Sequence, residues 1–369
     1  MPAAFVMSAR VLAFALGAIV VVWTLRSIIR TFVLPRNIRA KITWTLFRLL
    51  RMVFVMLMRF ARTYEQRDAL LAMYPPVGLL MLPLVWLTFI LLGFTGIFWA
   101  LEAHSFQQAM LLSGSSLFTL GFAALPSLGV TIFAFIEAAL GLMLVALFIG
   151  YLPTMYTAWS RREATVSLLE VRAGSPPSAV EMLLRYHHIG QLATMAQLWL
   201  TWEQWFTELG ETHTTLAALS LFRSSSPHRS WVTASGTIMD AASLMLSAID
   251  IPRNTEAGMC IRAGAIALRG IAQSLTSPYN PDPQKHHAIS LTREEFDDAL
   301  GRLAAAGIPL HQDRERAWRE FVEWRVNYDF TLLSLAHTLM APEAPWTSDR
   351  APTPFDSSLK ETEEPRRTR

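Results

Sequence analysis

Residues 107–123, QQAMLLSGSSLFTLGFA, decide the fold because they lie between the two longest uncharged stretches of the chain. Residues 69–101 contain no Asp, Glu, Lys or Arg, and Glu137 is the only charged residue in residues 105–160. A helix needs about 20 apolar residues to cross a bilayer, so each flank supplies one spanning helix. The segment between them must turn the chain around. Irregular backbone at membrane depth is tolerated where it lines a water-filled path or is buried in protein.

The end of this segment carries a family resemblance. Residues 115–123, SSLFTLGFA, resemble the filter of the potassium-channel pore family, whose signature reads T-V-G-Y-G. Residues 150–179 and 30–39 are similar to segments of bacterial single-pore, potassium-channel-like proteins. The resemblance covers roughly the first half of the chain. It implies an all-α fold with a membrane pore module made of an outer helix, a re-entrant pore helix, a filter loop and an inner helix.

The resemblance assigns the filter to the loop after the pore helix. Its main-chain oxygens belong to Thr119, Leu120, Gly121, Phe122 and Ala123. In the family such oxygens replace the hydration shell of a passing potassium ion, so we expect no resident metal or cofactor. The family's glycines allow alternate signs of φ, and Gly121 keeps one such position. Ala123 stands where the family has a second glycine, and a Cβ at positive φ costs about 1–2 kcal/mol. Strict potassium preference is therefore open, and a nonselective cation channel is the alternative.

We expect side chains behind this loop to support it. Glu137 falls within the inner helix, and an acid inside a membrane helix is functional by default. We expect its carboxyl group to hydrogen-bond to the pore-helix hydroxyl of Ser115 or Ser116. The alternatives are a partly protonated acid and an acid at the level of the lipid headgroups.

A gate hinge is expected in the inner helix, residues 131–159, with Gly150–Pro153 near its cytoplasmic end. Gly141 and Gly150 weaken that helix, and Pro153 removes one of its backbone hydrogen bonds. A kink without gating is the alternative.

Composition divides the chain into a membrane part and a helical domain. The 369 residues are 52% hydrophobic and 17% charged, and charge is concentrated after Ser160. A soluble protein has about 25% charged residues. The net charge of +3 comes with no nucleic-acid-binding signature, so we expect no such partner. Cys260 is the only cysteine, which excludes a disulfide framework and a cysteine-based zinc site.

The membrane part begins with an N-terminal transmembrane helix, residues 1–34, which contains an uncharged apolar run bounded by Arg10 and Arg26. Basic residues crowd its end, so the positive-inside rule places the N-terminus outside. Residues 35–68 form a basic cytoplasmic linker with an amphipathic helix at 42–60. That helix carries three arginines that can share one face: Arg48, Arg51 and Arg59. It lies on the membrane surface or packs as an ordinary helix against the pore, and whether it spans the membrane is open. The pore module then covers residues 69–163, with Pro75–Pro76 opening its outer helix.

Residues 164–341 predict a cytoplasmic, all-helical domain, and residues 342–369 a disordered tail. The helices expected are 178–209, 214–222, 230–249, 255–275, 292–307 and 313–340. Capping boxes start two of them, Ser178 with Glu181 and Thr292 with Glu295. The domain has no phosphate loop, nucleotide fingerprint or nucleophile elbow, so we expect no enzyme activity. Its regulatory ligand, if it has one, is unknown.

These patterns combine into one functional hypothesis. A filter needs four loops around an axis, and the chain has one, so a homotetramer is expected. Its surroundings are the lipid bilayer of the cytoplasmic (inner) membrane, crossed several times, with the C-terminal domain in the cytoplasm. Monovalent cations, potassium first, are the expected permeant partners. The rival from another class is a non-conducting, membrane-anchored helical scaffold or sensor.

Overall fold

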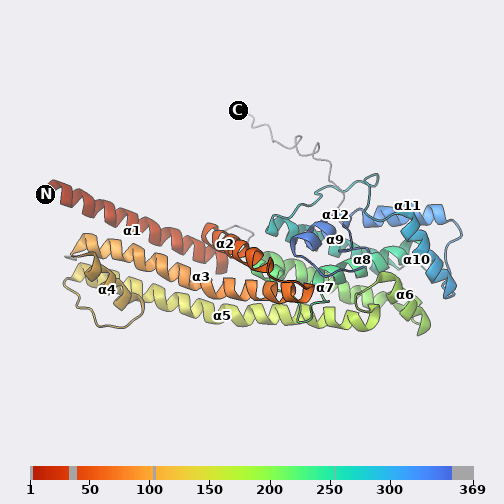
Figure 1. The fold of residues 1–369 in the computed structure, drawn as a ribbon, viewed down its shortest axis with the longest axis horizontal. Helices are drawn as coiled ribbons and strands as arrows, with labels where there is room; N and C mark the ends of the chain where they lie inside the picture. The colour runs from red at the N-terminus through yellow and green to blue at the C-terminus, as the bar shows by residue number, and fades with distance from the viewer. Residues whose placement is uncertain (1–2, 33–39, 103–104, 253, 351–369) are drawn as a thin grey trace, which may run out of the picture. The chain divides into compact units, whose positions relative to one another are not determined.

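The computed structural model describes residues 3–32, 40–102, 105–252 and 254–350, and all regular elements in these ranges are helices (Figure 1). The predicted all-α class is confirmed. The chain divides into a first unit, Met1–Thr157, and a second unit, Ala158–Arg369. The division falls a few residues before the predicted boundary at residue 163.

Three helices are long and apolar enough to cross a membrane, which makes this a membrane protein. They are α1 (Ala3–Phe32), α3 (Tyr64–Leu101) and α5 (Leu128–Ala173). The first unit also contains the shorter α2 (Lys41–Met58) and α4 (Phe106–Leu117). The helix α5 begins in the first unit and ends in the second.

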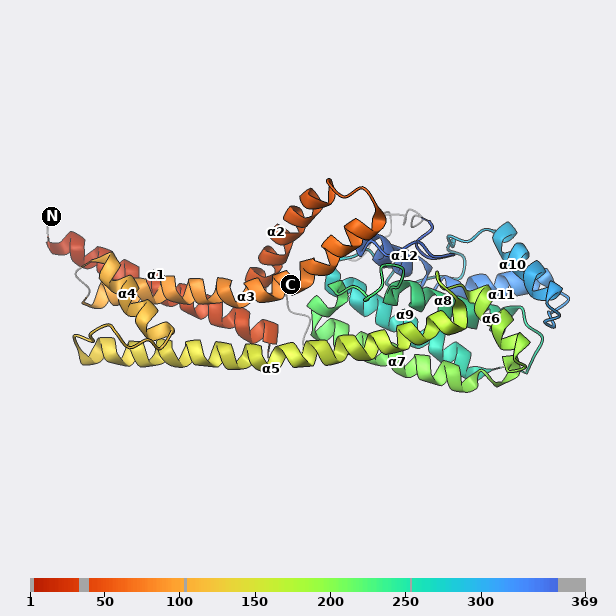
Figure 2. The same ribbon diagram turned by 60° about the horizontal axis from the view of Figure 1, so that its bottom comes forward.

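Small residues bring α1 and α3 together, and the two helices run side by side in Figures 1 and 2. A Cβ added at Gly17 of α1 would collide with the carbonyl oxygen of Gly93, and one at Gly96 would lie 3.1 Å from the carbonyl oxygen of Ala13. Small residues let membrane helices approach this closely, since apolar lipid gives no drive for association. The buried indole of Trp86 also donates to Ser27 Oγ at 3.2 Å.

The start of α3 differs from the prediction. Pro75 and Pro76 lie inside the helix, which begins at Tyr64. A complete capping box sets that start, with Thr63 Oγ1 accepting from the Gln66 amide at 3.3 Å and Gln66 accepting from the Thr63 amide. Membrane helices tolerate interior proline because neighbouring groups satisfy the freed carbonyls.

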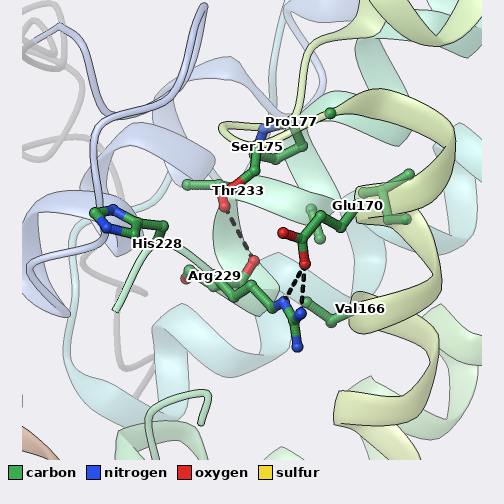
Figure 3. Close-up of a pocket in the computed structure, with 11 residues that line it drawn as sticks. Val166, Glu170, Ser175, Pro177, His228, Arg229 and Thr233 are labelled. Atoms are coloured by element: carbon green, nitrogen blue, oxygen red, sulfur yellow. Dashed lines mark hydrogen bonds and ion pairs between the residues drawn. The ribbon is translucent and has the colours of Figure 1, made fainter. Parts of the chain in front are cut away.

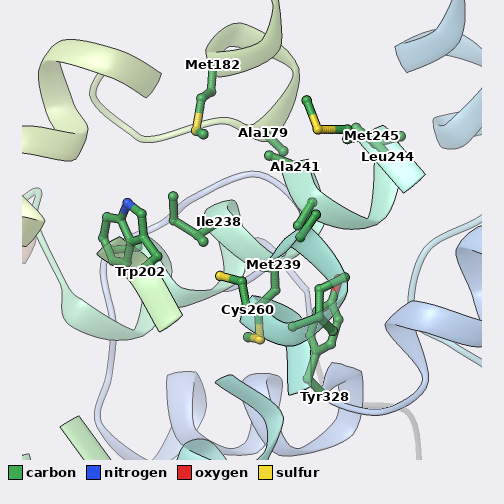
Figure 4. Packing of buried hydrophobic residues seen from close by; sticks show 14 of the residues in the cluster. Ala179, Met182, Trp202, Ile238, Met239, Ala241, Leu244, Met245, Cys260 and Tyr328 are labelled. Carbon is green, nitrogen blue, oxygen red and sulfur yellow. The ribbon is translucent and has the colours of Figure 1, made fainter. Parts of the chain in front are cut away.

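The second unit is a helical domain around a single apolar core. After the end of α5 its elements are α6 (Ala179–His188), η1 (Leu192–Thr194), α7 (Ala196–Thr215), η2 (Ala217–Leu221), α8 (Trp231–Ser247), α9 (Thr255–Leu275), α10 (Arg293–Ala305), α11 (Arg314–Arg325) and α12 (Asp329–Thr338). Figure 4 shows Trp202 of α7, Met239 of α8 and Cys260 of α9 within this core. The tryptophan spacing along α7 therefore marks a core stripe.

Two of the helices predicted for the helical domain are each two helices in the structure. The predicted helix 178–209 breaks after α6, where Gly190 has a φ of +69°, and α7 then continues past Gly210 to Thr215. The predicted helix 313–340 breaks between α11 and α12. The capping box of Thr292 and Glu295 is confirmed. At Ser178 only half of the box forms, because the Glu181 carboxylate pairs with Arg185 at 2.9 Å.

Residues 342–350 contradict the predicted disorder. Ala344 and Thr347 are buried, and Trp346 packs against the core. The buried guanidinium of Arg325 donates to the Trp346 carbonyl at 2.5 Å and also pairs with Asp240 and Asp329. Residues 351–369 of the predicted tail lie outside the described residues.

A second buried cation ties the end of α5 into the second unit. Arg162 contacts His213 Nε2 at 3.1 Å and donates to the carbonyls of Leu219 and Phe222 at 3.1 and 2.8 Å. Since Arg162 supplies the hydrogen, Nε2 of His213 is the acceptor and the ring is neutral. Burial, followed by the charge of Arg162, holds the pKa of His213 well below its ordinary 6.5.

Candidate pore-loop site

The predicted re-entrant segment is a short helix followed by an irregular loop. Ser105 caps α4 by accepting from the Gln108 amide at 3.2 Å, and the helix ends at Leu117. Residues 118–127 then lead to α5 without regular structure. In Figure 1, α4 and this loop lie at the same end of the first unit as the N-terminus of α1.

The loop begins with a helix C-cap built around a threonine. The Leu120 amide donates to the Ser115 carbonyl at 2.8 Å and the Thr119 amide to the Ser116 carbonyl at 3.0 Å. This pair of bonds is a Schellman motif, whose left-handed position usually holds glycine. Thr119 takes that position with a φ of +55°. A β-branched residue there costs about 1–2 kcal/mol.

Backbone strain therefore falls on Thr119. The penalty expected at Ala123 was wrong, because the non-glycine residues described with positive φ do not include Ala123. At Gly121 the backbone conformation favours glycine, since φ is +71°. Space does not, because no other heavy atom lies within 4 Å of an added Cβ.

The side chain of Ser115 holds the predicted filter residues against α4. Its buried Oγ accepts from the amides of Phe122 and Ala123, each at 3.1 Å. The predicted supporting residue is thus in contact with the loop, through backbone amides. Ser116, predicted beside it, bonds instead to the Leu112 carbonyl of its own helix at 3.0 Å.

Glu137 is buried, but its partner differs from the prediction. Its Oε1 lies 2.5 Å from Ser113 Oγ, and no hydrogen bond joins it to Ser115 or Ser116 in the described residues. Sequence reasoning missed Ser113. The available signal was its place four residues from Ala109 and from Leu117, on the buried side of α4.

A count of hydrogens favours a neutral Glu137. The Ser113 hydroxyl has a single hydrogen but lies within bonding distance of both Glu137 Oε1, at 2.5 Å, and the Leu91 carbonyl, at 3.0 Å. Both contacts become hydrogen bonds when the Glu137 carboxylic acid donates to Ser113 and Ser113 donates to Leu91. Glu137 Oε2 is buried without a partner, which costs a neutral carbonyl far less than a carboxylate.

The three predicted hinge residues lie in a helix that continues without interruption through Pro153. A Cβ at Gly141 would collide with the Leu117 carbonyl, so this glycine lets the end of α4 approach α5. Gly150 has no heavy atom within 4 Å of its added Cβ. Hinge motion at Gly150 and Pro153 stays a prediction, whereas Gly141 has a packing role.

Among the described residues of the second unit we find no comparable site. Its small hollow between Val166 and Thr233 contains the ion pair of Glu170 with Arg229, whose Nε donates at 2.6 Å (Figure 3). Within the described ranges, no group of three or more His, Cys, Asp and Glu side chains is arranged to hold a metal ion.

Comparison of the chain with protein-family models, curated proteins and solved structures finds no match. Its function is therefore inferred from its own residues.

Proposed function

We propose that this chain is one subunit of a homotetrameric, potassium-channel-like cation channel of the cytoplasmic membrane. Ions would pass through a ring of main-chain oxygens from Thr119 to Ala123. The proposal rests on the resemblance of residues 115–123 to a filter and on the way Ser115 holds this loop.

The contacts of Ser115 orient the loop carbonyls, and this observation carries the proposal. In a trans peptide the N–H and the preceding C=O point in opposite directions. The amides of Phe122 and Ala123 point toward Ser115. The carbonyls of Gly121 and Phe122, in the same peptides, therefore point away from α4. Carbonyl oxygens aligned in this way are what a selectivity filter uses to replace an ion's water.

Two further features support cation conduction by several chains. The C-terminal end of the α4 dipole lies at the loop and favours positive charge. In the isolated chain, Leu120 and Phe122 are 63% and 62% exposed, a large apolar surface at the site itself. Neighbouring subunits around a fourfold axis would cover it, and a filter needs four loops.

Three crossings give a consistent orientation. With the basic end of α1 in the cytoplasm, α3 runs outward and α5 returns. In the proposed orientation α4 and its loop would lie at the outer face and the second unit in the cytoplasm, where it would act as a regulatory or assembly domain.

Two alternatives follow from particular residues. Ala123 in place of the family's glycine favours a nonselective cation channel. The left-handed Thr119, which turns the loop away from an extended strand, favours a non-conducting membrane-anchored scaffold.

Ion flux from sealed liposomes separates these functions. We expect the purified protein to release potassium faster than sodium. Gly121→Ala should abolish flux, because φ is +71° at this position, while Gly129→Ala, where φ is not in that region, serves as the control. Equal potassium and sodium rates would support the nonselective channel. No flux from correctly assembled protein would refute conduction and leave the scaffold.

A further inference from the structure

The amphipathic helix α2 is the largest feature of the first unit that the channel proposal does not use. It is 18 residues long and contains Lys41, Arg48 and Arg51 but no acidic residue. It is not among the three candidate spanning helices. In Figure 2, α2 and the first turns of α3 form a hairpin whose turn stands away from α1, while the start of α2 contacts the end of α1 through Thr43 and Thr31.

One side of α2 packs against the protein. Phe54 and Met58 are buried, and the Phe47 carbonyl accepts from the Tyr74 hydroxyl of α3 at 3.0 Å. The Tyr74 ring also meets the rings of Phe47 and Phe54 edge-on, with centroids 5.9 and 5.6 Å apart. These contacts fix the rotation of α2 about its axis.

A second side is apolar and uncovered. Leu49, Val53 and Met56 follow the i, i+4, i+7 spacing of a single helix face. They are 52%, 54% and 63% exposed, and Leu57 beside them is 43% exposed. This surface flanks the packed side along the whole second half of the helix.

A third side is basic. Arg48 and Arg51 are exposed and three residues apart, and Val55 lies between them on the helix surface. The guanidinium of Arg48 stacks over the ring of Trp44, 5.0 Å from its centroid. Arg59, just past the helix end, is exposed on the same side.

We propose that α2 is a membrane-surface helix that binds the anionic lipids of the leaflet on its side of the bilayer. The side with Leu49, Val53 and Met56 enters the boundary between headgroups and acyl chains, as in other interfacial helices. Arg48 and Arg51 lie at the level of the phosphates, where each basic residue is attracted by the negative surface. Two observations select a lipid surface over a protein partner. The helix α2 has no acidic residue, and the unit that contains it also contains helices long and apolar enough to span a membrane. The sequence left open whether 42–60 is interfacial, packed or spanning. The structure shows one packed side, and the proposal assigns the uncovered side to the membrane surface.

Spin labels on two matched valines test the proposal without any need for conduction. The buried native cysteine is replaced by Cys260→Ser, and a nitroxide is attached at Val53→Cys on the apolar side or at Val55→Cys on the basic side. The full-length protein is placed in bilayers of phosphatidylcholine with or without phosphatidylglycerol. Collision with oxygen reports lipid, and collision with a polar nickel chelate reports water.

We expect the ratio of oxygen to nickel collisions to be severalfold higher at Val53 than at Val55. The double change Arg48→Gln with Arg51→Gln should lower the Val53 ratio in bilayers with phosphatidylglycerol and leave it unchanged in phosphatidylcholine alone. The pair Arg262→Gln with Arg302→Gln removes the same charge from exposed positions of the second unit and should have no effect.

Four results would overturn the proposal. Water access at both valines would place α2 off the membrane, and oxygen access at both would make it a spanning helix. Protection of both labels from both reagents would show that another protein surface, such as a second copy of the chain, covers it. An Arg48/Arg51 effect independent of phosphatidylglycerol would overturn the preference for anionic lipid.

Discussion

The two neighbouring serines of α4 give a matched test of how the loop is held. Ser115→Ala removes the oxygen that accepts from the Phe122 and Ala123 amides. Ser116→Ala removes an oxygen that bonds only to the Leu112 carbonyl of the same helix. The two changes are chemically identical and adjacent, so their difference reports the loop contacts alone.

The expected difference follows from the bonds lost. A typical hydrogen bond contributes about 1 kcal/mol net, so Ser115→Ala weakens the attachment of the loop by about 2 kcal/mol. Ser116→Ala costs about 0 kcal/mol or stabilises slightly, since Ala is the better helix former and the serine bond to the preceding turn is weak.

Hydrogen exchange of the loop amides measures this attachment. Local opening free energies set the exchange rate of native amides, so a loss of about 2 kcal/mol corresponds to about 30-fold faster exchange. We expect this acceleration at Phe122 and Ala123 in Ser115→Ala, with wild-type rates in Ser116→Ala. Potassium flux in liposomes should fall in the first variant and persist in the second.

Equal exchange rates at these two amides in both variants would contradict the assignment of Ser115 as the residue that holds the loop. So would a uniform acceleration across α4 and α5 in Ser115→Ala, because it would mean a general loss of helix packing.

Three other predictions concern buried polar groups. Glu137→Gln should keep near-wild-type thermal stability in detergent, because an amide donates to Ser113 as the neutral acid does; a large loss would indicate a carboxylate. Arg325→Met should cost about 3–5 kcal/mol in chemical denaturation of the second unit, since it leaves Asp240 and Asp329 buried without their cation; a cost below about 1 kcal/mol would contradict this. His213 has a pKa below that of the unfolded chain, so the unfolded state takes up the proton first and stability should fall as pH drops below 6.5. His213→Gln should flatten that dependence in denaturation midpoints measured across this range, and an unchanged slope would exclude His213 as its source.

Local patterns predicted much of the first unit. The uncharged stretches predicted α3 and α5, and the apolar run bounded by Arg10 and Arg26 predicted α1. The need for positive φ at Gly121 was also readable, because glycine alone takes that conformation without cost. The start of α3 was missed although Thr63 and Gln66 form a capping box in the sequence. The paired prolines suggested a helix start, but the capping box sets it eleven residues earlier, at Tyr64.

The remaining misses depend on contacts between distant residues. The order of residues 342–350 comes from Arg325 and from Arg350, whose guanidinium donates to Glu295 at 2.9 Å across 55 positions. No local composition rule contains such a pair. The Glu137 partner depended on the rotation of α4, and Ser113, Ser115 and Ser116 differ only in which side of that helix they occupy.

Recording from purified protein in a planar bilayer, with potassium on one side and sodium on the other, tests most directly whether the oxygens around Gly121 line an ion path. We expect unitary currents whose reversal potential favours potassium, carried by particles of four chains, and lost in Gly121→Ala but retained in Gly129→Ala. Silent bilayers containing intact four-chain particles, or currents that survive Gly121→Ala unchanged, would contradict it.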